Sequence, residues 1–274
     1  MPQGSILGPL LFIIYLNDVP NCCQKLKLVL YADDTTVFTT FETIIQDTES
    51  LDTAINSELA ELCNWFKSNK LSLNANKSKA MIFHVINKRI DVPHIVIDNT
   101  TVEICDTFEF LGFTLNKHLK WSSHIEKISR KISKTVGILN RLKNFLPSNI
   151  LTTIYQSLIS PHLNYGVLAW GYKAEKIFKL QRKAIRTISL NKYNADPDPI
   201  FKKLSILKIH DILKLQQLKF YFKLENNQLP AYFRTFELIK HSDVHTYETR
   251  GAELFVTPLV YYESSKHCLR NSLP

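Results

Sequence analysis

Apolar residues recur at helical spacing in several segments of the chain. Leu51, Ile55, Leu59 and Leu62 lie three or four positions apart, which predicts an amphipathic helix over residues 47–69. The same spacing predicts six further helices, over residues 4–17, 122–144, 148–159, 175–188, 199–204 and 210–224. Periodicity is weak in about the last fifty residues, so we assign no structure there.

Strand-like segments are concentrated in the first part of the chain. Residues 26–31 and 35–39 predict a hairpin with an acidic tip, Ala32-Asp33-Asp34. A second hairpin is expected over 95–98 and 101–104, turning at Asn99-Thr100. Further strands are expected over residues 71–73, 80–86 and 108–115. Strands followed by helices predict an α+β protein, with the change near residues 116–120.

Charge divides the chain at the same place. The net charge is 34 − 25 = +9, but residues 1–119 carry 9 Lys and Arg against 14 Asp and Glu. Residues 120–274 carry 25 against 11, so the basic half is suited to a polyanion. Solvated helix faces would give the same charge balance.

Composition excludes several other classes of protein. No apolar run approaches the roughly 20 residues that span a bilayer, so no membrane association is expected. The start has no basic segment before its apolar stretch, which argues against secretion. The five cysteines are odd in number and lack Cys-x-x-Cys spacing, as expected of reduced thiols. We therefore predict an intracellular protein, nuclear or cytoplasmic.

The adjacent pair Asp33-Asp34 is the first candidate for chemistry. Two carboxylates side by side repel one another, and divalent cations such as Mg²⁺ remove that penalty. Two such ions can hold the attacking and leaving oxygens of a phosphoryl transfer. An exposed turn also tolerates two acidic residues, because Asp favours turns, so the pair alone leaves both interpretations open.

Flanking motifs favour the first interpretation, because together they resemble reverse transcriptases. Tyr31-Ala32-Asp33-Asp34 between apolar strands resembles the catalytic hairpin of that family. Residues 2–12 are similar to the segment before it, residues 71–83 to the segment that closes the polymerase palm, and Phe110-Leu111-Gly112 to the primer grip. Four matches in the family's order are far more specific than any one.

The second half of the chain resembles a particular branch of that family. Residues 159–166, Trp170-Gly171 and residues 180–186 are similar to the region after the palm in polymerases of jockey-like non-LTR retrotransposons. The resemblance implies a partial palm over residues 1–115, a small antiparallel sheet with helices. An all-helical thumb-like region over 116–170 and a basic helical connection region over 171–274 would follow.

The resemblance also implies roles for individual residues. Asp33 and Asp34 would be catalytic and would bind two Mg²⁺ ions. The nucleotide and template pocket would contain Gln3, Gly4, Ser5, Tyr31, Ala32 and Lys77. Lys79 competes with Lys77 for the place beside the incoming triphosphate. The primer grip would be Phe110, Leu111 and Gly112, although core packing would explain its apolar members equally well.

Nucleic-acid contact is expected from the basic helix over residues 122–144. Given the resemblance, its side chains would neutralise phosphates of the template–primer duplex: Lys127, Arg130, Lys131 and Lys134. The implied partners are an RNA template, a DNA primer and deoxynucleoside triphosphates. Tyr165 and Trp170 could stack on bases, but core packing is the simpler expectation.

A reverse transcriptase palm also needs a carboxylate on an earlier strand, and that strand and the fingers precede the Pro-Gln-Gly segment in the family. This segment begins here at Pro2. We therefore expect a 5′-truncated fragment that holds its metals weakly and is inactive alone. A non-catalytic nucleic-acid-binding remnant and a non-functional relic with exposed apolar faces are the alternatives.

Overall fold

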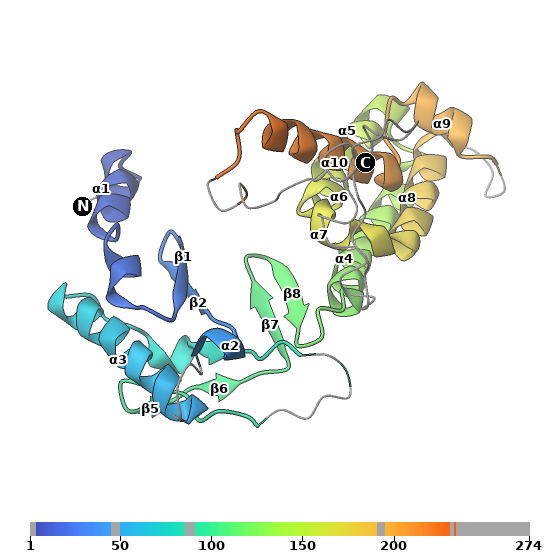
Figure 1. Ribbon diagram of the computed structural model, residues 1–274. Coiled ribbons are helices and arrows are strands. Elements are labelled where there is room, and N and C mark those ends of the chain that lie inside the picture. The colour runs from blue at the N-terminus through green and yellow to red at the C-terminus, as the bar shows by residue number, and fades with distance from the viewer. Residues whose placement is uncertain are drawn as a thin grey trace, which may run out of the picture. The chain divides into compact units, whose positions relative to one another are not determined.

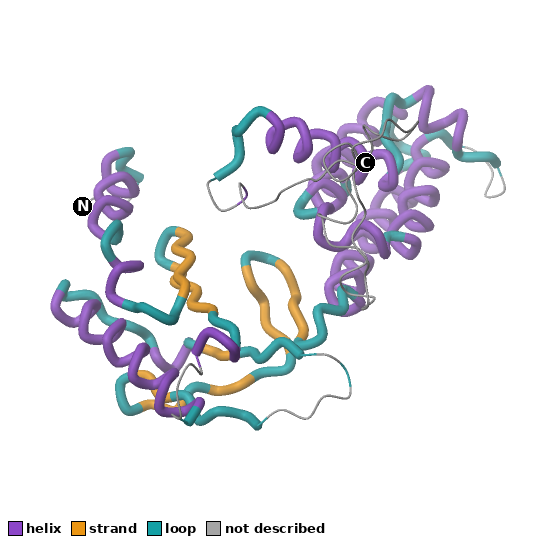
Figure 2. The backbone as a smooth tube through the Cα atoms, in the orientation of Figure 1, coloured by secondary structure: helices purple, strands orange, loops and turns teal. Residues whose placement is uncertain are grey.

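The computed structural model describes residues 4–44, 50–84, 86, 91–190, 195–230 and 233. The chain forms two compact units, Met1–Phe108 and Glu109–Pro274 (Figure 1). The first unit combines helices with short strands, and the second is mostly helical, as the colouring of Figure 2 shows. The chain is therefore an α+β protein, as predicted.

Helix α3 (Leu51–Ser68) organises the core of the first unit. The Ser50 side chain caps it by accepting a 3.3 Å hydrogen bond from the Thr53 backbone N–H. Its buried positions follow the predicted helical period: Ala54, Leu59, Leu62, Cys63 and Phe66. The helix predicted over 47–69 is thus confirmed for the part that the structure describes.

The other helices of the first unit are short. They are α1 (Leu7–Tyr15), the 3₁₀ turn η1 (Val19–Cys22), α2 (Phe41–Ile44) and the 3₁₀ turn η2 (Ala75–Lys77). No residue of α1 is buried, although its sequence is apolar almost throughout. Ile6 and Ile14, for example, are 86% and 67% exposed. This unit therefore presents an apolar helix surface to solvent.

Strands in the described residues form four separate pairs instead of one small antiparallel sheet. The pairs β1 (Lys27–Tyr31) with β2 (Asp34–Phe38) and β4 (Val96–Ile97) with β5 (Thr100–Thr101) are antiparallel. The pair β3 (Lys79–Ala80) with β6 (Glu103–Ile104) is parallel. The fourth pair is β7 (Thr107–Phe110) with β8 (Phe113–Asn116).

Three local strand predictions are wrong. Residues 71–73 form no strand, since Leu71 and Leu73 pack against the core without a ladder partner. The β4–β5 turn is Asp98-Asn99, one residue earlier than predicted, because these two residues adopt the left-handed φ values of 52° and 63° that a two-residue hairpin turn requires. The single strand predicted over 108–115 is two strands, broken at Leu111-Gly112.

The strand predicted over residues 80–86 is confirmed only at its first residue. β3 ends at Ala80, and residues 81–84 are not in a strand. β6, its ladder partner, also ends at the paired position, Ile104, so no backbone partner continues the ladder. Residue 85 lies outside the described part of the chain.

The second unit is built on two long helices, α4 (Ser122–Leu142) and α8 (Glu175–Ile188), which pack against each other. The remaining helices surround them: α5 (Ser148–Leu158), α6 (Ser160–Asn164), α7 (Val167–Trp170), the 3₁₀ turn η3 (Gly171–Lys173), α9 (Asp198–Lys203) and α10 (Ile209–Glu225). In the described residues after Asn116, helices are joined by turns and loops, and no strand occurs.

One core joins all the helices of the second unit. Its largest fully buried side chains include Tyr155 and Trp170, so the core-packing expectation for Trp170 is confirmed. Buried residues from both 116–170 and 171–274 belong to this core. The division of the chain into these two ranges, and their assignment as thumb and connection, stays a prediction.

A buried glutamine ties three helices of this core together. Gln181 on α8 is fully buried, and its Nε2 donates to the Tyr155 hydroxyl and to the Leu207 carbonyl oxygen, both at 2.9 Å. Its Oε1 accepts a 3.0 Å hydrogen bond from the Ile209 backbone N–H, at the start of α10. The amide group therefore satisfies polar groups that would otherwise be buried without partners.

Membrane insertion finds no support in the helices that the structure describes. None of them combines the length and the apolar character that crossing a bilayer would require.

Candidate functional site

The acidic hairpin β1–β2 closes with the pair Tyr31 and Asp34, so Ala32 and Asp33 form a two-residue turn. Tyr31 and Asp34 share the solvent-exposed face of the hairpin, as cross-strand partners do. The opposite face packs on the core of the first unit through Leu28, Leu30 and Val37. The predicted hairpin is thus confirmed, with both carboxylates at its exposed tip.

The backbone at this tip is strained. Ala32 has φ = 52°, in the left-handed region that residues with a Cβ adopt at a cost of about 1 kcal/mol. Such strain is often retained at functional sites, where it fixes the direction of neighbouring side chains. Here it occurs immediately before Asp33 and Asp34.

The two aspartates provide hard oxygen ligands of the kind that a divalent cation prefers. Both are exposed, and no cationic side chain of the described residues pairs with either. In the same described part of the chain, no group of three or more His, Cys, Asp or Glu side chains is arranged to hold a metal. Binding of a divalent cation by Asp33 and Asp34 therefore stays a prediction.

The predicted pocket residues before α1 make no polar contact with this tip in the described part of the chain. Gln3 lies outside the described residues. Gly4 has φ = +89° and Ser5 is partly buried, just before α1. No hydrogen bond or ion pair joins either of these two described residues to Asp33 or Asp34.

The structure distinguishes the two candidate lysines after the hairpin. The Lys79 Nζ lies 3.0 Å from the Glu103 carboxylate across the β3–β6 pair, so its charge is already compensated. Lys77 ends η2, whose first turn is capped by the Asn74 side chain. Its side chain is exposed and has no acidic partner among the described residues. Lys77 is therefore the better placed of the two to meet an anion.

The predicted primer-grip residues Phe110, Leu111 and Gly112 form the tip of the β7–β8 hairpin. Leu111 and Gly112 have φ values of 44° and 82°, so both turn residues are left-handed. Phe110 is partly buried at the end of β7. The structure thus brings these three residues together at a turn, where Gly112 is exposed and Leu111 is partly buried.

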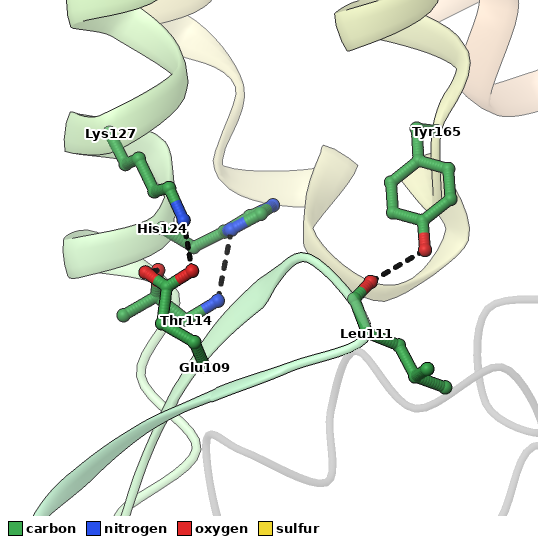
Figure 3. Close-up of polar contacts among 6 residues, drawn as sticks. All are labelled: Glu109, Leu111, Thr114, His124, Lys127 and Tyr165. Carbon is green, nitrogen blue, oxygen red and sulfur yellow. Dashed lines mark hydrogen bonds and ion pairs between the residues drawn. The ribbon is translucent and has the colours of Figure 1, made fainter. Parts of the chain in front are cut away.

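Polar contacts attach this hairpin to α4 and to the turn after α6 (Figure 3). The Thr114 backbone N–H donates a 3.2 Å hydrogen bond to His124 Nδ1, and the Glu109 carboxylate pairs with Lys127. The hydrogen bond from Lys127 lowers the pKa of Glu109. At the tip, the Tyr165 hydroxyl donates to the Leu111 carbonyl oxygen at 2.6 Å.

His124 is buried in this attachment and must be neutral there. Its Nδ1 accepts the Thr114 hydrogen bond, which requires an unprotonated nitrogen, while its Nε2 is buried without a partner. Burial lowers the pKa of His124, and the nearby Lys127 lowers it further. The sequence did not predict that His124 holds the hairpin, because a single His near the start of a helix has no distinctive spacing.

The four predicted phosphate-binding residues of α4 differ in their surroundings. Lys127 is paired with Glu109, and Arg130 lies 3.5 Å from the Glu126 carboxylate one turn earlier. Lys131 and Lys134 are exposed, and no acidic side chain of the described residues pairs with them. Among these four residues, the charge available for a polyanion is therefore at Lys131 and Lys134.

The first part of the chain is similar to a known family of proteins. Residues 1–115 match the family described as reverse transcriptase (RNA-dependent DNA polymerase). This match contains the acidic hairpin and both segments that flank it.

Similarity to reverse transcriptases extends through the helical unit. The RNA-directed DNA polymerase from mobile element jockey of Drosophila melanogaster is 28% identical over 232 residues, 80% of this chain and 24% of that relative. Its Drosophila funebris counterpart is 26% identical over 83% of this chain and 26% of the relative. A probable RNA-directed DNA polymerase from transposon X-element of Drosophila melanogaster is 25% identical, with the same coverage.

These matches confirm the resemblance to reverse transcriptases of jockey-like non-LTR elements. The chain spans about a quarter of the length of the curated relatives it matches. No solved structure matches the chain. The two jockey relatives are named as RNA-directed DNA polymerases, which are nucleotidyltransferases.

Proposed function

We propose that this chain supplies part of an RNA-directed DNA polymerase: carboxylates of the catalytic site and a basic surface for the template–primer duplex. The observation that carries this proposal is the exposed Asp33-Asp34 pair at a strained hairpin tip, within a segment that matches the reverse transcriptase family. The substrates would be an RNA template, a DNA primer and deoxynucleoside triphosphates.

Asp33 and Asp34 would bind Mg²⁺ in this site. When bound, the ion would supply activation of the primer 3′-hydroxyl and neutralisation of the leaving pyrophosphate. Lys77 would add a positive charge near the triphosphate. The Leu111–Gly112 turn would hold the primer strand, while Lys131 and Lys134 would neutralise phosphates of the duplex.

Two carboxylates are fewer ligands than a pair of catalytic Mg²⁺ ions requires, and no third acidic residue joins them in the described part of the chain. We therefore expect the purified chain to bind Mg²⁺ weakly and to carry out no template-directed synthesis alone. This makes non-catalytic nucleic-acid binding the second candidate function of the isolated chain.

Titration with Mn²⁺, which reports directly on the site through its paramagnetism, tests the first part of the proposal. Asp33→Asn combined with Asp34→Asn should abolish saturable Mn²⁺ binding. The control variant Asp91→Asn, an exposed aspartate away from the hairpin, should bind as the unmodified chain does. Equal binding in all three proteins would refute the assignment of the metal site.

Primer extension on an RNA template tests the second part. The unmodified chain should give no extended product with Mg²⁺ or Mn²⁺ while still binding the template–primer duplex. Robust extension by the unmodified chain, abolished in Asp33→Asn, would confirm the polymerase assignment. It would contradict our expectation that the metal site is incomplete. Absence of both extension and duplex binding would refute both candidate functions.

A further inference from the structure

The turn at the tip of the β7–β8 hairpin needs support from outside the hairpin. Leu111 occupies the left-handed region at φ = 44°, which a leucine disfavours because its Cβ crowds the following carbonyl. It is nevertheless followed directly by a second left-handed residue, Gly112. A two-residue turn of this kind is expected to be mobile unless another element holds it.

Tyr165 contacts both this turn and the residue after it. Its hydroxyl donates a 2.6 Å hydrogen bond to the Leu111 carbonyl oxygen (Figure 3). Its ring stacks on Phe113 with centroids 5.0 Å apart and an angle of 20° between the planes. The same ring lies beside Gly112, where an added Cβ would be 3.6 Å from Tyr165 Cε1. Tyr165 is nevertheless 55% exposed, so filling the core does not explain its position.

The backbone of Tyr165 is itself fixed by the helical core. The indole N–H of Trp170 donates a 3.1 Å hydrogen bond to the Tyr165 carbonyl oxygen, and Trp170 is fully buried. Gly166 follows in the left-handed conformation at φ = +58°, with the Phe113 ring directly against its Cα. A continuous set of contacts therefore runs from Trp170 through Tyr165 to the Leu111 carbonyl.

We propose that Tyr165 is a positioning residue that holds the Leu111–Gly112 turn in place for the primer strand. The inference rests on the proposed function, in which this turn contacts the primer. Tyr165 acts through the Leu111 carbonyl and the Phe113 ring, and one face of its own ring is already occupied by Phe113. It is therefore assigned no stacking on a base.

Hydrogen exchange in the full chain tests the positioning role without any nucleic acid. Tyr165→Phe removes the hydroxyl and keeps the ring, so the amide of Phe113, the first residue of β8, should exchange about tenfold faster, as expected for the loss of one hydrogen bond. Tyr155→Phe is the matched control, because it removes a tyrosine hydroxyl from the same unit without touching the hairpin. That variant should leave exchange at the turn unchanged.

Nucleic-acid binding tests whether the position of the turn matters for the primer. The probes are an RNA template carrying a recessed DNA primer and a continuous RNA–DNA duplex of the same length. Tyr165→Phe should weaken binding of the recessed primer end about fivefold and leave binding of the continuous duplex unchanged, since the lysines of α4 are intact. A variant that is only destabilised would bind both the recessed primer end and the continuous duplex more weakly, because part of it would be unfolded.

The outcomes separate this inference from the proposed function. Unchanged exchange at Phe113 in Tyr165→Phe overturns the positioning role. Equal effects of Tyr165→Phe and Tyr155→Phe on exchange or primer binding also overturn it. Faster exchange together with no preference for a primer end in the unmodified chain supports the positioning role and refutes the primer-grip function of the turn.

Discussion

Gly166 lies directly against the ring of Phe113: a Cβ built on Gly166 would come within 2.1 Å of Phe113 Cζ. Gly166 also has φ = +58°, which disfavours a side chain independently of the space available. The contact therefore requires glycine for two separate reasons, and it joins the β7–β8 hairpin to the start of α7.

Gly166→Ala should consequently destabilise the second unit by about 3 kcal/mol, the sum of overpacking against Phe113 and backbone strain. Urea unfolding followed by circular dichroism measures this change. Gly137→Ala is the matched control, because Gly137 lies within α4 with open space where its Cβ would be. That change should stabilise the chain by about 0.5–1 kcal/mol, and similar losses in both variants would contradict the role of the contact.

Gln181→Leu should be one of the more damaging single changes in the helical unit. It leaves the Leu207 carbonyl and the Ile209 N–H buried without their partner, together with the Tyr155 hydroxyl. We expect a loss of about 3 kcal/mol in the free energy of unfolding. Tyr155→Phe removes only one of these hydrogen bonds and should cost about 1 kcal/mol, so equal losses would argue against a network centred on Gln181.

Stability should fall in mild acid because of His124. Burial lowers the pKa of this imidazole below its ordinary value of 6.5, Lys127 and Lys131 add to the decrease, and Glu109 opposes it. The unfolded chain therefore binds a proton that the folded chain does not. The stabilisation is complete above pH 6.5 and is lost as the pH falls from 6.5 towards the folded pKa.

Unfolding free energies measured from about pH 8 to about pH 5 check this direction. His124→Asn keeps an acceptor near the Thr114 N–H but cannot titrate, so its stability should depend less on pH. His162, whose pKa is also lowered by burial, contributes with the same sign in both proteins. An unchanged pH dependence in His124→Asn would show that His124 is not the responsible group.

Lys131 and Lys134 should contribute more to duplex binding than the paired cations of the same helix. Changing both to Gln should reduce the slope of log affinity against log salt by about two, one for each phosphate that is no longer neutralised. Changing Lys127 and Arg130 to Gln should reduce it less, because Glu109 pairs with Lys127 and because Glu126, which also pairs with Lys176, lies 3.5 Å from Arg130. Fluorescence anisotropy at a series of salt concentrations measures both slopes, and a larger decrease for the second pair would contradict the assignment.

Local sequence patterns predicted the longer helices and the acidic hairpin, but not the short helices α2, α6 and α7. The spacing of Leu59 and Leu62 in α3, or of Ile128 and Ile132 in α4, reflects one buried face per helix, and this face is encoded within a few residues. The turn between the two halves of residues 108–115 was missed because Leu111, an apolar residue of strand-like character, occupies a left-handed turn position.

The sequence alone determined which residue types are available and led to the prediction of metal binding by adjacent carboxylates between apolar strands and of nucleic-acid binding by a basic helix. Only the tertiary structure decided which of these groups are free to act. Lys127 is compensated by Glu109, and the Leu111 carbonyl is held by Tyr165, 54 residues away. Such pairings depend on which faces of the helices and strands pack together after folding. Hydrophobic periodicity describes only a few neighbouring residues, so it gives no information about these pairings.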